Sequence, residues 1–413
     1  MSRSRPLLWL SVGLDLLGVL IGALLAAQLR HQNPALVLKA DALLLIALFL
    51  LLAWFLGGYS FLRWPWMPYT QLLRRWLLVV GSALALAEFV GWLLNAAPAD
   101  VWFHPSRGSL LIPGLVLLAW GAMTRFWLQP LAQAKLAHHQ ASEAFDQLEI
   151  VSASPRQLLL LFVAYHPSDL EVRQLQACLA ELPPQVGYAV VVNDHHPGEA
   201  VDQLQAEADC FLTNCDNPGY GRAVNRLVLR LGQLPPYIGV LNTDLSWQAG
   251  TFQQLLAWLQ QHPQVNLAVP QILDEAGTPQ QLCKQHPTVL GLFSRRFLPG
   301  WLKPNWLKRY DRWYVMSDQN YREVLEAPYL SGCCMLIRSE AFRRVGGFDE
   351  RYFLYLEDAD LTRSLARDGR CVHLPVAGVV HGWGRGNYRN LGLMAVNLIS
   401  AWQYFRKWGW ALW

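Results

Sequence analysis

Apolar residues are unevenly distributed along the 413-residue chain, and their pattern predicts two kinds of structure. Before residue 130 there are four apolar runs of roughly twenty residues, the length of a helix that crosses a bilayer. They occupy 7–29, 42–61, 76–94 and 110–128. The first run has no evident small-residue cleavage site and three more follow it, so we interpret it as a membrane span and not as a signal peptide. We expect a four-helix transmembrane module at 1–130.

After a polar stretch at 131–156, interpreted as a helical connector, short apolar runs alternate with helical patterns. The run 158–165 is continuously apolar, as in a strand that is buried on both faces. Further strands are predicted at 188–192, 210–213, 237–241 and 265–269, and helices at 170–182, 199–208, 221–231 and 251–262. This alternation predicts an α/β domain at 157–388 with a mostly parallel sheet. Ligands bind at the carboxyl ends of such strands, so the loops there should converge.

Aromatic residues gather in two later segments. The stretch 389–413 carries four tryptophans around Arg406 and Lys407, which predicts an interfacial amphipathic helix. A helix packed on the domain core is the alternative. The irregular segment 283–327 contains Trp301 and Lys308, and we expect the stretch between these two residues to lie at a bilayer surface.

Composition agrees with a chain that is partly in lipid, because 53% of the residues are hydrophobic and only 15% are charged. Lys and Arg near the ends of the predicted spans place both termini in the cytoplasm. We therefore expect a multi-pass protein of the inner (cytoplasmic) membrane with a cytoplasmic catalytic domain. Residues 1–130 contain nine Lys/Arg and four Asp/Glu, whereas the rest is balanced at 25 against 26. A balanced domain lacks the basic stripe that nucleic acid requires, so we predict no nucleic-acid partner.

Two features of the sequence suggest structural and not catalytic roles. Seven cysteines without a CxxC spacing favour buried, reduced thiols over zinc sites or disulfides. Asp15 and Glu88 lie within predicted spans, where a carboxylate is costly unless it is paired or protonated. A neutral, hydrogen-bonded helix contact is favoured for both, and a lipid-headgroup or proton site is the alternative.

Two motifs follow predicted strands. In the segment 216–225, Gly219 and Gly221 permit close approach of a ligand to a helix N-terminus, where anions bind. Asn242 and Asp244 end another strand with their side chains on one side. Such paired oxygens suit Mg²⁺ or Mn²⁺ bridging to a diphosphate. The alternative is a turn that caps the helix starting near residue 251.

A third motif concentrates acids between residues 329 and 360. Asp349 follows a Gly-Gly turn, and Glu357, Asp358 and Asp360 begin a helical pattern. Acids in a first helical turn stabilise the helix dipole, which is the structural alternative. Their number beside an apolar strand favours a general base in this cluster.

Together these three blocks resemble the inverting glycosyltransferases of family two, which have the GT-A fold, and most closely the rhamnosyltransferase-like members. The resemblance spans about 157–385. It implies that Asp244 is a metal ligand and Asp358 the general base, with Glu357 and Asp360 in the same motif. It places His381, as a late metal or phosphate ligand, in the metal site. It implies nucleotide-sugar contacts at Tyr165, Asn193, Asp194, Asn217, Gly219, Arg222, Asn225 and Asn242. Asn193 stands where the family has Asp, which leaves recognition of the base open.

Residues 8–128 loosely resemble the membrane module of polyprenyl-phosphate sugar-1-phosphate transferases. We therefore predict a metal-dependent, inverting hexosyltransferase that uses Mg²⁺ or Mn²⁺. It would move a sugar, rhamnose among the candidates, from a nucleotide-sugar donor to a polyprenyl-diphosphate-linked glycan in surface polysaccharide synthesis. Its partners would be both substrates and membrane lipid, and an oligomer formed through the membrane module is left open. The rival hypotheses are a catalytically silent scaffold and a sugar-1-phosphate transferase.

Overall fold

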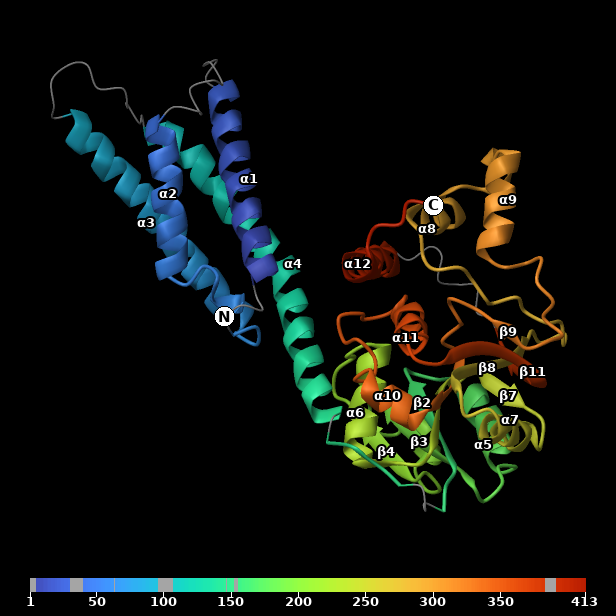
Figure 1. The fold of residues 1–413 in the computed structure, drawn as a ribbon. Helices are drawn as coiled ribbons and strands as arrows, with labels where there is room; N and C mark the ends of the chain where they lie inside the picture. Colours follow the sequence, from blue (N-terminus) through green and yellow to red (C-terminus); the bar gives the residue numbers. More distant parts are fainter. Residues whose placement is uncertain are drawn as a thin grey trace. The chain divides into compact units, whose positions relative to one another are not determined.

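A computed structural model describes residues 5–29, 40–62, 64–95, 107–145, 147–151, 155–382 and 391–413. The chain divides into two compact units, Met1–Leu136 and Ala137–Trp413, and we describe each by itself. The boundary falls inside a helix, six residues after the end predicted for the membrane module. We call them the helical unit and the α/β unit (Figure 1).

The helical unit contains the four predicted helices. They are α1 (Arg5–Leu29), α2 (Ala40–Phe55), α3 (Tyr69–Asn95) and α4 (Arg107–Phe145), with a short 3-10 turn, η3 (Ser60–Leu62). Helix α4 continues through Pro130 into the segment predicted as a separate connector. Within the described residues α1 alone, over Leu7–Leu25, is long and apolar enough to cross a bilayer, while α2 contributes only the shorter apolar stretch Ile46–Phe55. The prediction of four spans is therefore not supported.

One buried ion pair organises the helical unit. Both guanidinium nitrogens of Arg125 donate to the carboxylate of Asp15, at 2.8 and 2.9 Å, and the Tyr59 hydroxyl donates to the same group at 2.8 Å. Arg125 also lies over the ring of Trp76, 3.5 Å from its centroid. Asp15 is fully buried, so the favoured explanation, a helix contact, holds for it, although the contact is an ion pair. Glu88 is exposed. Arg30, Lys39 and Arg63, on which the predicted orientation depends, lie outside the described residues.

In the α/β unit the apolar runs become strands, because both faces of the sheet are covered. The strands are β1 (Glu149–Ile150), β2 (Leu158–Ala164), β3 (Val186–Val192), β4 (Cys210–Thr213), β5 (Gln233–Leu234), β6 (Tyr237–Asn242), β7 (Leu245–Trp247), β8 (Val265–Leu273), β9 (Leu325–Glu326), β10 (Cys334–Arg338) and β11 (Arg370–His381). Every residue of β2 and β3 is buried. Strands β1 and β5 form a separate parallel pair.

Nine of the described strands form one sheet in the order β4-β3-β2-β6-β10-β8-β11-β7, with β9 beside β11. Strands β4, β3, β2 and β6 are parallel, as predicted. Strand β10 runs antiparallel to both β6 and β8, and β7 and β9 run antiparallel to β11. Half of the sheet is therefore mixed, and the prediction of a mostly parallel sheet is correct only for the other half.

The remaining elements of the α/β unit are mostly helical. They are α5 (Asp169–Leu179), η4 (Ala200–Leu204), α6 (Tyr220–Leu231), α7 (Thr251–Gln261), α8 (Val289–Phe297), η5 (Gly300–Leu302), α9 (Asn305–Tyr314), α10 (Ser339–Arg344), α11 (Glu357–Leu365) and α12 (Leu391–Trp408). The helix predicted at 199–208 is only the 3-10 turn η4. On α12, Tyr404 and Phe405 are buried in a cluster with Tyr329 and Tyr352, so this face of the helix packs on the domain, as the alternative prediction had it.

Candidate active site

The predicted metal ligands Asp244 and His381 meet at one edge of the sheet. Asp244 follows β6, and the pairing of β7 with the end of β11 sets His381 opposite Leu245. Nε2 of His381 lies 3.2 Å from Oδ2 of Asp244. The other carboxylate oxygen of Asp244 is shielded from solvent and has no hydrogen-bond partner among the described residues. The capping alternative is wrong, because the N-cap residue of α7 is Gly250 and the helix has no side-chain cap.

The protonation state of His381 depends on its neighbours. Burial acts to lower the pKa of His381, but hydrogen bonds to Asp244 and to the nearby Cys333 outweigh it and raise this pKa to about 10. The imidazole therefore carries a proton while it faces the carboxylate. A divalent cation between the two groups would replace that proton.

Asp358 is held by a different set of contacts. Its carboxylate accepts hydrogen bonds from the backbone N–H of Gly332 at 3.0 Å, from that of Ala359 at 2.9 Å and from the Tyr329 hydroxyl at 3.2 Å. Tyr355 and Leu356, just before α11, both have left-handed backbone conformations. The N-cap position, Leu356, makes no side-chain cap, and Glu357, Asp358 and Asp360 lie in the first turn, where acids also stabilise the helix dipole. Strained backbone of this kind is concentrated at functional sites.

Burial gives the two acids at the start of α11 unusual acidities. It raises the pKa of Asp358, and the positive charge of Lys284 opposes that rise. Burial, with repulsion from Asp358, raises the pKa of Glu357 to about 8. One oxygen of Glu357 is shielded and has no hydrogen-bond partner in the described part of the chain. Asp358 is thus the better-solvated and better-supported carboxylate of the pair.

Asp360, predicted to join the catalytic acids, has a different position. It is buried, and its carboxylate accepts hydrogen bonds from Lys407 Nζ at 2.7 Å and from the Trp408 indole N–H at 2.6 Å. Lys407 also pairs with Asp349 at 3.0 Å, so both carboxylates serve to attach α12. These partners favour a structural role for Asp360, and its predicted place among the catalytic acids stays a prediction.

The predicted nucleotide contacts divide into two groups. Tyr165 is exposed at the end of β2, and Asp194 adopts a left-handed conformation after β3. Asn193 is buried, where its side-chain oxygen accepts from Asn214 at 2.9 Å and its amide donates to Asn217 at 3.5 Å. Asn242 ends β6 beside them, since β6 pairs with β2. These residues line the carboxyl edge as predicted, and contact with a nucleotide stays a prediction.

Arg222, Asn225 and Gly219 make close contacts within the protein. Arg222 forms an ion pair with Glu350 at 3.0 Å, and Asn225 is fully buried and exchanges hydrogen bonds with the backbone of Phe348. Gly219 has φ 91°, and a Cβ there would lie 2.2 Å from the carbonyl oxygen of Phe353. The close approach that the glycine permits is therefore to the protein's own backbone. Helix α6 thus contacts the loop that precedes Asp358, and ligand contact by these three residues stays a prediction.

Several residues of this site were not predicted. Lys284 is half-buried, and its Nζ lies 4.4 Å from the ring centroid of Tyr329, whose hydroxyl donates to Asp358. Gly332 is required sterically, since a Cβ there would lie 2.9 Å from the Cβ of Asp358. Tyr329 and Gly332 belong to the acid-rich stretch that the sequence singled out, whereas nothing in the pattern around Lys284 marked it.

Part of the chain is similar in sequence to two curated proteins. No known family profile matches the chain. Two curated sequences from Mycobacterium tuberculosis, of strains CDC 1551 / Oshkosh and ATCC 25618 / H37Rv, are each 36% identical to it over 177 residues, which is 40% of this chain and 56% of the relative. Both are named N-acetylglucosaminyl-diphospho-decaprenol L-rhamnosyltransferase. The chain thus spans little more than half the length of the relatives it matches.

Similar solved structures are more distant. GalNAc-T7 with UDP, GalNAc and Mn²⁺ has a TM-score of 0.45 and 12% identity, covering 65% of this chain and 53% of that one. The mannosyltransferase PcManGT from Pyrobaculum calidifontis with GDP-Man and Mn²⁺ has a TM-score of 0.41 and 14% identity, covering 67% and 74%. These likenesses are too remote to support an argument about function.

Proposed function

We propose that this chain is an inverting glycosyltransferase of the family-two kind, with a GT-A fold, that transfers a sugar from a nucleotide-sugar donor to a hydroxyl of a polyprenyl-diphosphate-linked glycan. The observation that carries the proposal is the arrangement of Asp358. Its half-buried carboxylate accepts hydrogen bonds from two backbone N–H groups and from the Tyr329 hydroxyl, and it lies in the same unit as the pair Asp244 and His381. The 36% identity to two rhamnosyltransferases supports the reaction class, and rhamnose is the first donor sugar to test.

Asp244 and His381 suit a divalent cation. One oxygen of the Asp244 carboxylate is shielded from solvent and has no hydrogen-bond partner among the described residues, and the second oxygen lies 3.2 Å from an imidazole nitrogen of His381. Carboxylate and imidazole are ligands of Mn²⁺, and carboxylate is a ligand of Mg²⁺. When bound, the cation supplies positive charge that stabilises the leaving diphosphate.

In the proposed mechanism Asp358 removes the proton of the acceptor hydroxyl. The hydroxyl oxygen attacks the anomeric carbon, the bond from that carbon to the diphosphate oxygen breaks, and the nucleoside diphosphate leaves with the electron pair. The configuration at the anomeric carbon inverts because attack and departure occur on opposite faces. Burial strengthens Asp358 as a base by raising its pKa, while the charge of Lys284 favours the ionised form that accepts the proton.

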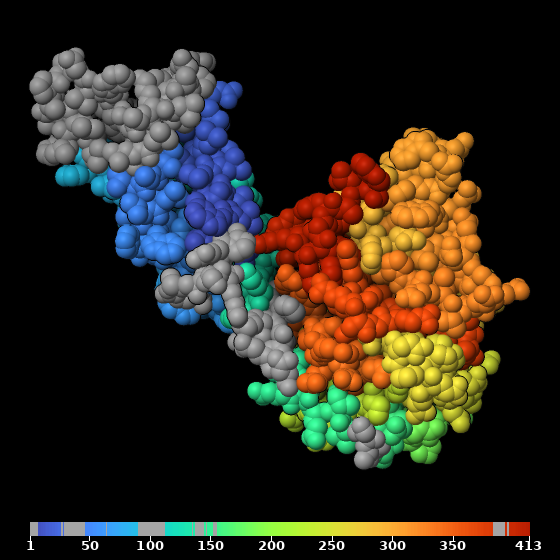
Figure 2. Space-filling view, viewed as in Figure 1, coloured from blue at the N-terminus to red at the C-terminus, as the bar shows by residue number. Residues whose placement is uncertain are grey.

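The acceptor is proposed to arrive from a lipid surface. Large apolar side chains lie exposed on α8, η5, α9 and the C-terminal residues, which we call the aromatic face: Phe293, Phe297, Trp301, Leu302, Trp306, Trp313, Trp410, Leu412 and Trp413. Backbone hydrogen bonds from Val289 to Ala411 and from Leu290 to Leu412 join the two segments. Figures 1 and 2 show α8, α9 and the C-terminus at the same end of the α/β unit.

The charge of the aromatic face matches anionic lipid. Residues 289–314 contain six basic residues and one acid, Asp311, which pairs with Lys303 at 2.6 Å. Exposed tryptophans among basic residues are typical of protein surfaces that lie at the membrane interface. Val289 and Leu292 of α8 pack against the cluster that contains Tyr329, the hydrogen-bond donor to Asp358. We therefore propose a cytoplasmic-membrane protein, anchored by α1, with the aromatic face at the bilayer surface.

One assay tests the activity. The purified full-length chain is incubated with Mg²⁺ or Mn²⁺, a lipid-linked N-acetylglucosamine acceptor and each of several nucleotide sugars. We expect transfer with release of a nucleoside diphosphate, abolished in Asp358→Asn. Release of a nucleoside monophosphate would indicate a sugar-1-phosphate transferase. Absence of turnover with every donor would favour the scaffold hypothesis.

A second measurement tests the aromatic face. Hydrogen exchange of the full-length chain is compared in detergent, in uncharged lipid discs and in anionic lipid discs. We expect peptides covering 289–314 and 408–413 to be protected most in anionic discs, and the triple variant Trp301→Ala, Trp306→Ala, Trp413→Ala to lose this protection. The variant Leu170→Ala, at an exposed apolar position on α5, is the matched control. Equal exchange in all three environments would contradict the proposal.

A further inference from the structure

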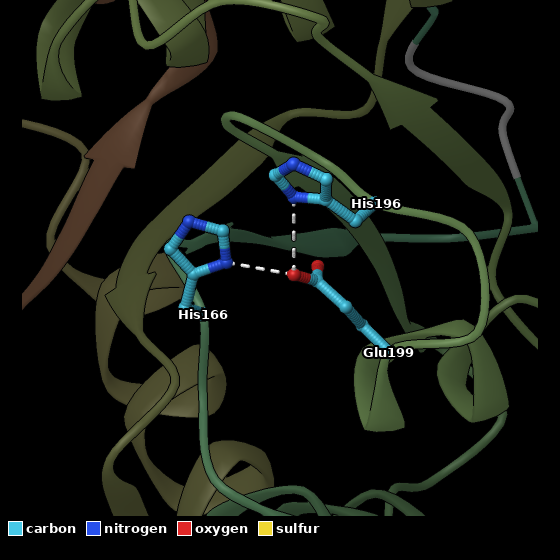
Figure 3. Close-up of side chains that lie close together, drawn as sticks. All are labelled: His166, His196 and Glu199. Carbon is cyan, nitrogen blue, oxygen red and sulfur yellow. Dashed lines mark hydrogen bonds and ion pairs between the residues drawn. The ribbon is translucent and has the colours of Figure 1, made fainter.

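Two loops at the carboxyl edge of the sheet bring a pair of histidines and a glutamate together. His166 follows β2, whereas His196 and Glu199 belong to the loop after β3. Nδ1 of His166 lies 2.7 Å from Oε1 of Glu199, and Nδ1 of His196 lies 3.7 Å from the same oxygen (Figure 3). All three potential ligand atoms lie within 4.8 Å of one another. None of these residues belongs to the pair Asp244 and His381.

The far nitrogen of His166 has a partner of its own. Nε2 of His166 lies 3.3 Å from Oδ2 of Asp194. A histidine that binds a metal ordinarily donates its other ring N–H to a carboxylate, which fixes the tautomer and orients the ring. Without a metal, Nδ1 of His166 carries a proton and donates it to Glu199; a bound cation would take the place of that proton, while Nε2 keeps its own proton toward Asp194. Asp194 therefore occupies the supporting position expected around a metal ligand.

The two adjacent histidines of the second loop have different contacts. Nε2 of His195 lies 2.7 Å from Oδ1 of Asp202, and the backbone N–H of Gly198 donates to the other oxygen of Asp202 at 2.8 Å. His195 thus anchors the loop to η4. His196 is left on the side of Glu199, where its ring lies 5.7 Å from that of His166, measured between centroids.

The backbone and the glutamate add two independent observations. His166 and Asp194 both have positive φ, 46° and 53°, a conformation that costs energy in residues other than glycine. The second oxygen of Glu199 is shielded from solvent and has no hydrogen-bond partner among the described residues. The fold therefore keeps His166 and Asp194 in an unfavourable backbone conformation. They lie beside a Glu199 oxygen that has no hydrogen-bond partner among the described residues.

We propose that His166, His196 and Glu199 bind a transition-metal cation of the Zn²⁺ class, at a site separate from the proposed catalytic cation. Two imidazole nitrogens and one carboxylate, with a water in the fourth position, form a common zinc ligand set. Tetrahedral bonds of about 2.0–2.1 Å place ligand atoms roughly 3.3–3.4 Å apart, so only small side-chain rotations are needed from the present separations. The cation would join the loops that follow β2 and β3.

Co²⁺ serves as the spectroscopic probe for this site. The full-length chain in detergent is stripped of metal with a chelator and titrated with Co²⁺. We expect one equivalent to give the visible absorption of a four-coordinate Co²⁺ ion, displaced by Zn²⁺ but not by excess Mg²⁺, which prefers oxygen ligands. Substitutions His196→Ala and Glu199→Gln should remove the absorption, and Asp194→Asn should weaken binding about ten- to one-hundred-fold.

Matched controls separate this site from others on the chain. His262→Ala removes a histidine that is stacked on Trp258, outside the cluster, and Asp244→Asn removes the proposed catalytic ligand. Both should retain the absorption. Zn²⁺ should also slow hydrogen exchange of residues 165–167 and 194–199 in the unaltered chain but not in His196→Ala, whose exposed side chain leaves the fold intact. The proposal is overturned if the unaltered chain gives no absorption, if His196→Ala retains it, or if Asp244→Asn loses it.

Discussion

Asp358 and Asp360 stand two residues apart in one helical turn, yet their surroundings differ in almost every respect. Asp358 is half-buried and is held by two backbone N–H groups and a tyrosine hydroxyl. Asp360 is buried against Lys407 and Trp408 of the C-terminal helix. Because residues two apart point about 200° away from each other around a helix, one faces the sheet edge and the other faces α12.

The difference shows how two acids of one short motif can have different roles, one structural and one catalytic. An ionised carboxylate paired with a lysine and an indole is committed to structure, because removing either partner leaves a buried charge. A carboxylate whose partners are backbone N–H groups keeps its orientation and still has lone pairs for a substrate proton. We infer that Asp360 fixes α11 and thereby positions Asp358.

The largest effect is expected when the base itself is changed. Asp358→Asn removes the proton acceptor and keeps one oxygen, which can accept from Gly332 or from Ala359 but not from both. We expect kcat/KM to fall about 10²- to 10⁴-fold, while the variant stays folded with an unfolding temperature lowered by the lost hydrogen bond. Initial rates of nucleoside diphosphate release measure the first quantity and thermal unfolding the second. A greater loss of activity in Asp360→Asn, at a temperature where both variants are folded, would reverse the assignment.

The attachment of α12 gives the next largest effect, on stability. Lys407→Met removes the cation that lies 2.7 Å from Asp360 and 3.0 Å from Asp349, which leaves a buried carboxylate without its charge partner. Breaking such a pair costs about 3–5 kcal/mol. Urea unfolding of the purified chain measures this free energy.

A neighbouring cation provides the control for Lys407. Arg406 is exposed and lies over the ring of Trp402, 5.1 Å from its centroid. Arg406→Met should therefore cost no more than about 1 kcal/mol. Equal losses in the two variants would show that α12 is held by apolar packing alone, without a contribution from the ion pairs.

The strands and the metal candidates follow from local patterns in the sequence. A continuous apolar run marked β2, and polar residues at the end of a strand marked Asn242 and Asp244. Because parallel strands end at one edge, the loops after them were predicted to converge, whereas Asn193 was indicated by the family resemblance. The meeting of His381 with Asp244 depends further on the pairing of β7 with β11, which is non-local.

What the sequence did not reveal depends on contacts between distant segments. Arg222 and Asn225 have the chemistry of ligand-binding residues at a helix start, and only the return of the chain at Phe348 and Glu350 occupies them. Lys407 was predicted to face a membrane interface, whereas it pairs with two buried acids far from it in the chain. Periodicity describes which face of an element is apolar and does not identify the partner of a polar group.

A smaller loss of activity is expected when Asp358 is kept but its side chain is shifted by a substitution at Gly332. A methyl group in Gly332→Ala would lie 2.9 Å from the Cβ of Asp358, so the carboxylate or the loop must shift. Misplacement of a catalytic group by 1 Å costs about 10²-fold in rate. We expect kcat to fall while KM for the donor changes little. Gly300→Ala, where a Cβ meets no atom within 4 Å, is the control, and an equal rate in both variants would contradict the steric argument.

The smallest effect concerns Glu357. Burial, and then repulsion from Asp358, raise the pKa of this carboxyl from an ordinary value of 4.5 to about 8. Below about pH 4.5 the carboxyl is protonated in both the folded and the unfolded chain. Between 4.5 and about 8 the unfolded chain loses this proton and the folded chain keeps it, so the stability associated with this group is lost as pH rises through that range. Glu357→Gln removes the titration, and its unfolding temperature should therefore decline less steeply from pH 5 to pH 8 than that of the unaltered chain.

The exposed Glu340 on α10 provides the comparison for this pH dependence. Glu340→Gln makes the same change of side chain at an exposed position, so an effect shared by both variants would belong to the substitution itself and not to burial of the carboxyl. The same slope in Glu357→Gln and in the unaltered chain would mean that Glu357 is ionised in the fold. In that case Glu357 and Asp358 would be two adjacent negative charges, and the proposed difference in their protonation would be wrong. The contrast between Asp358 and Asp360 would then rest on their hydrogen bonds alone.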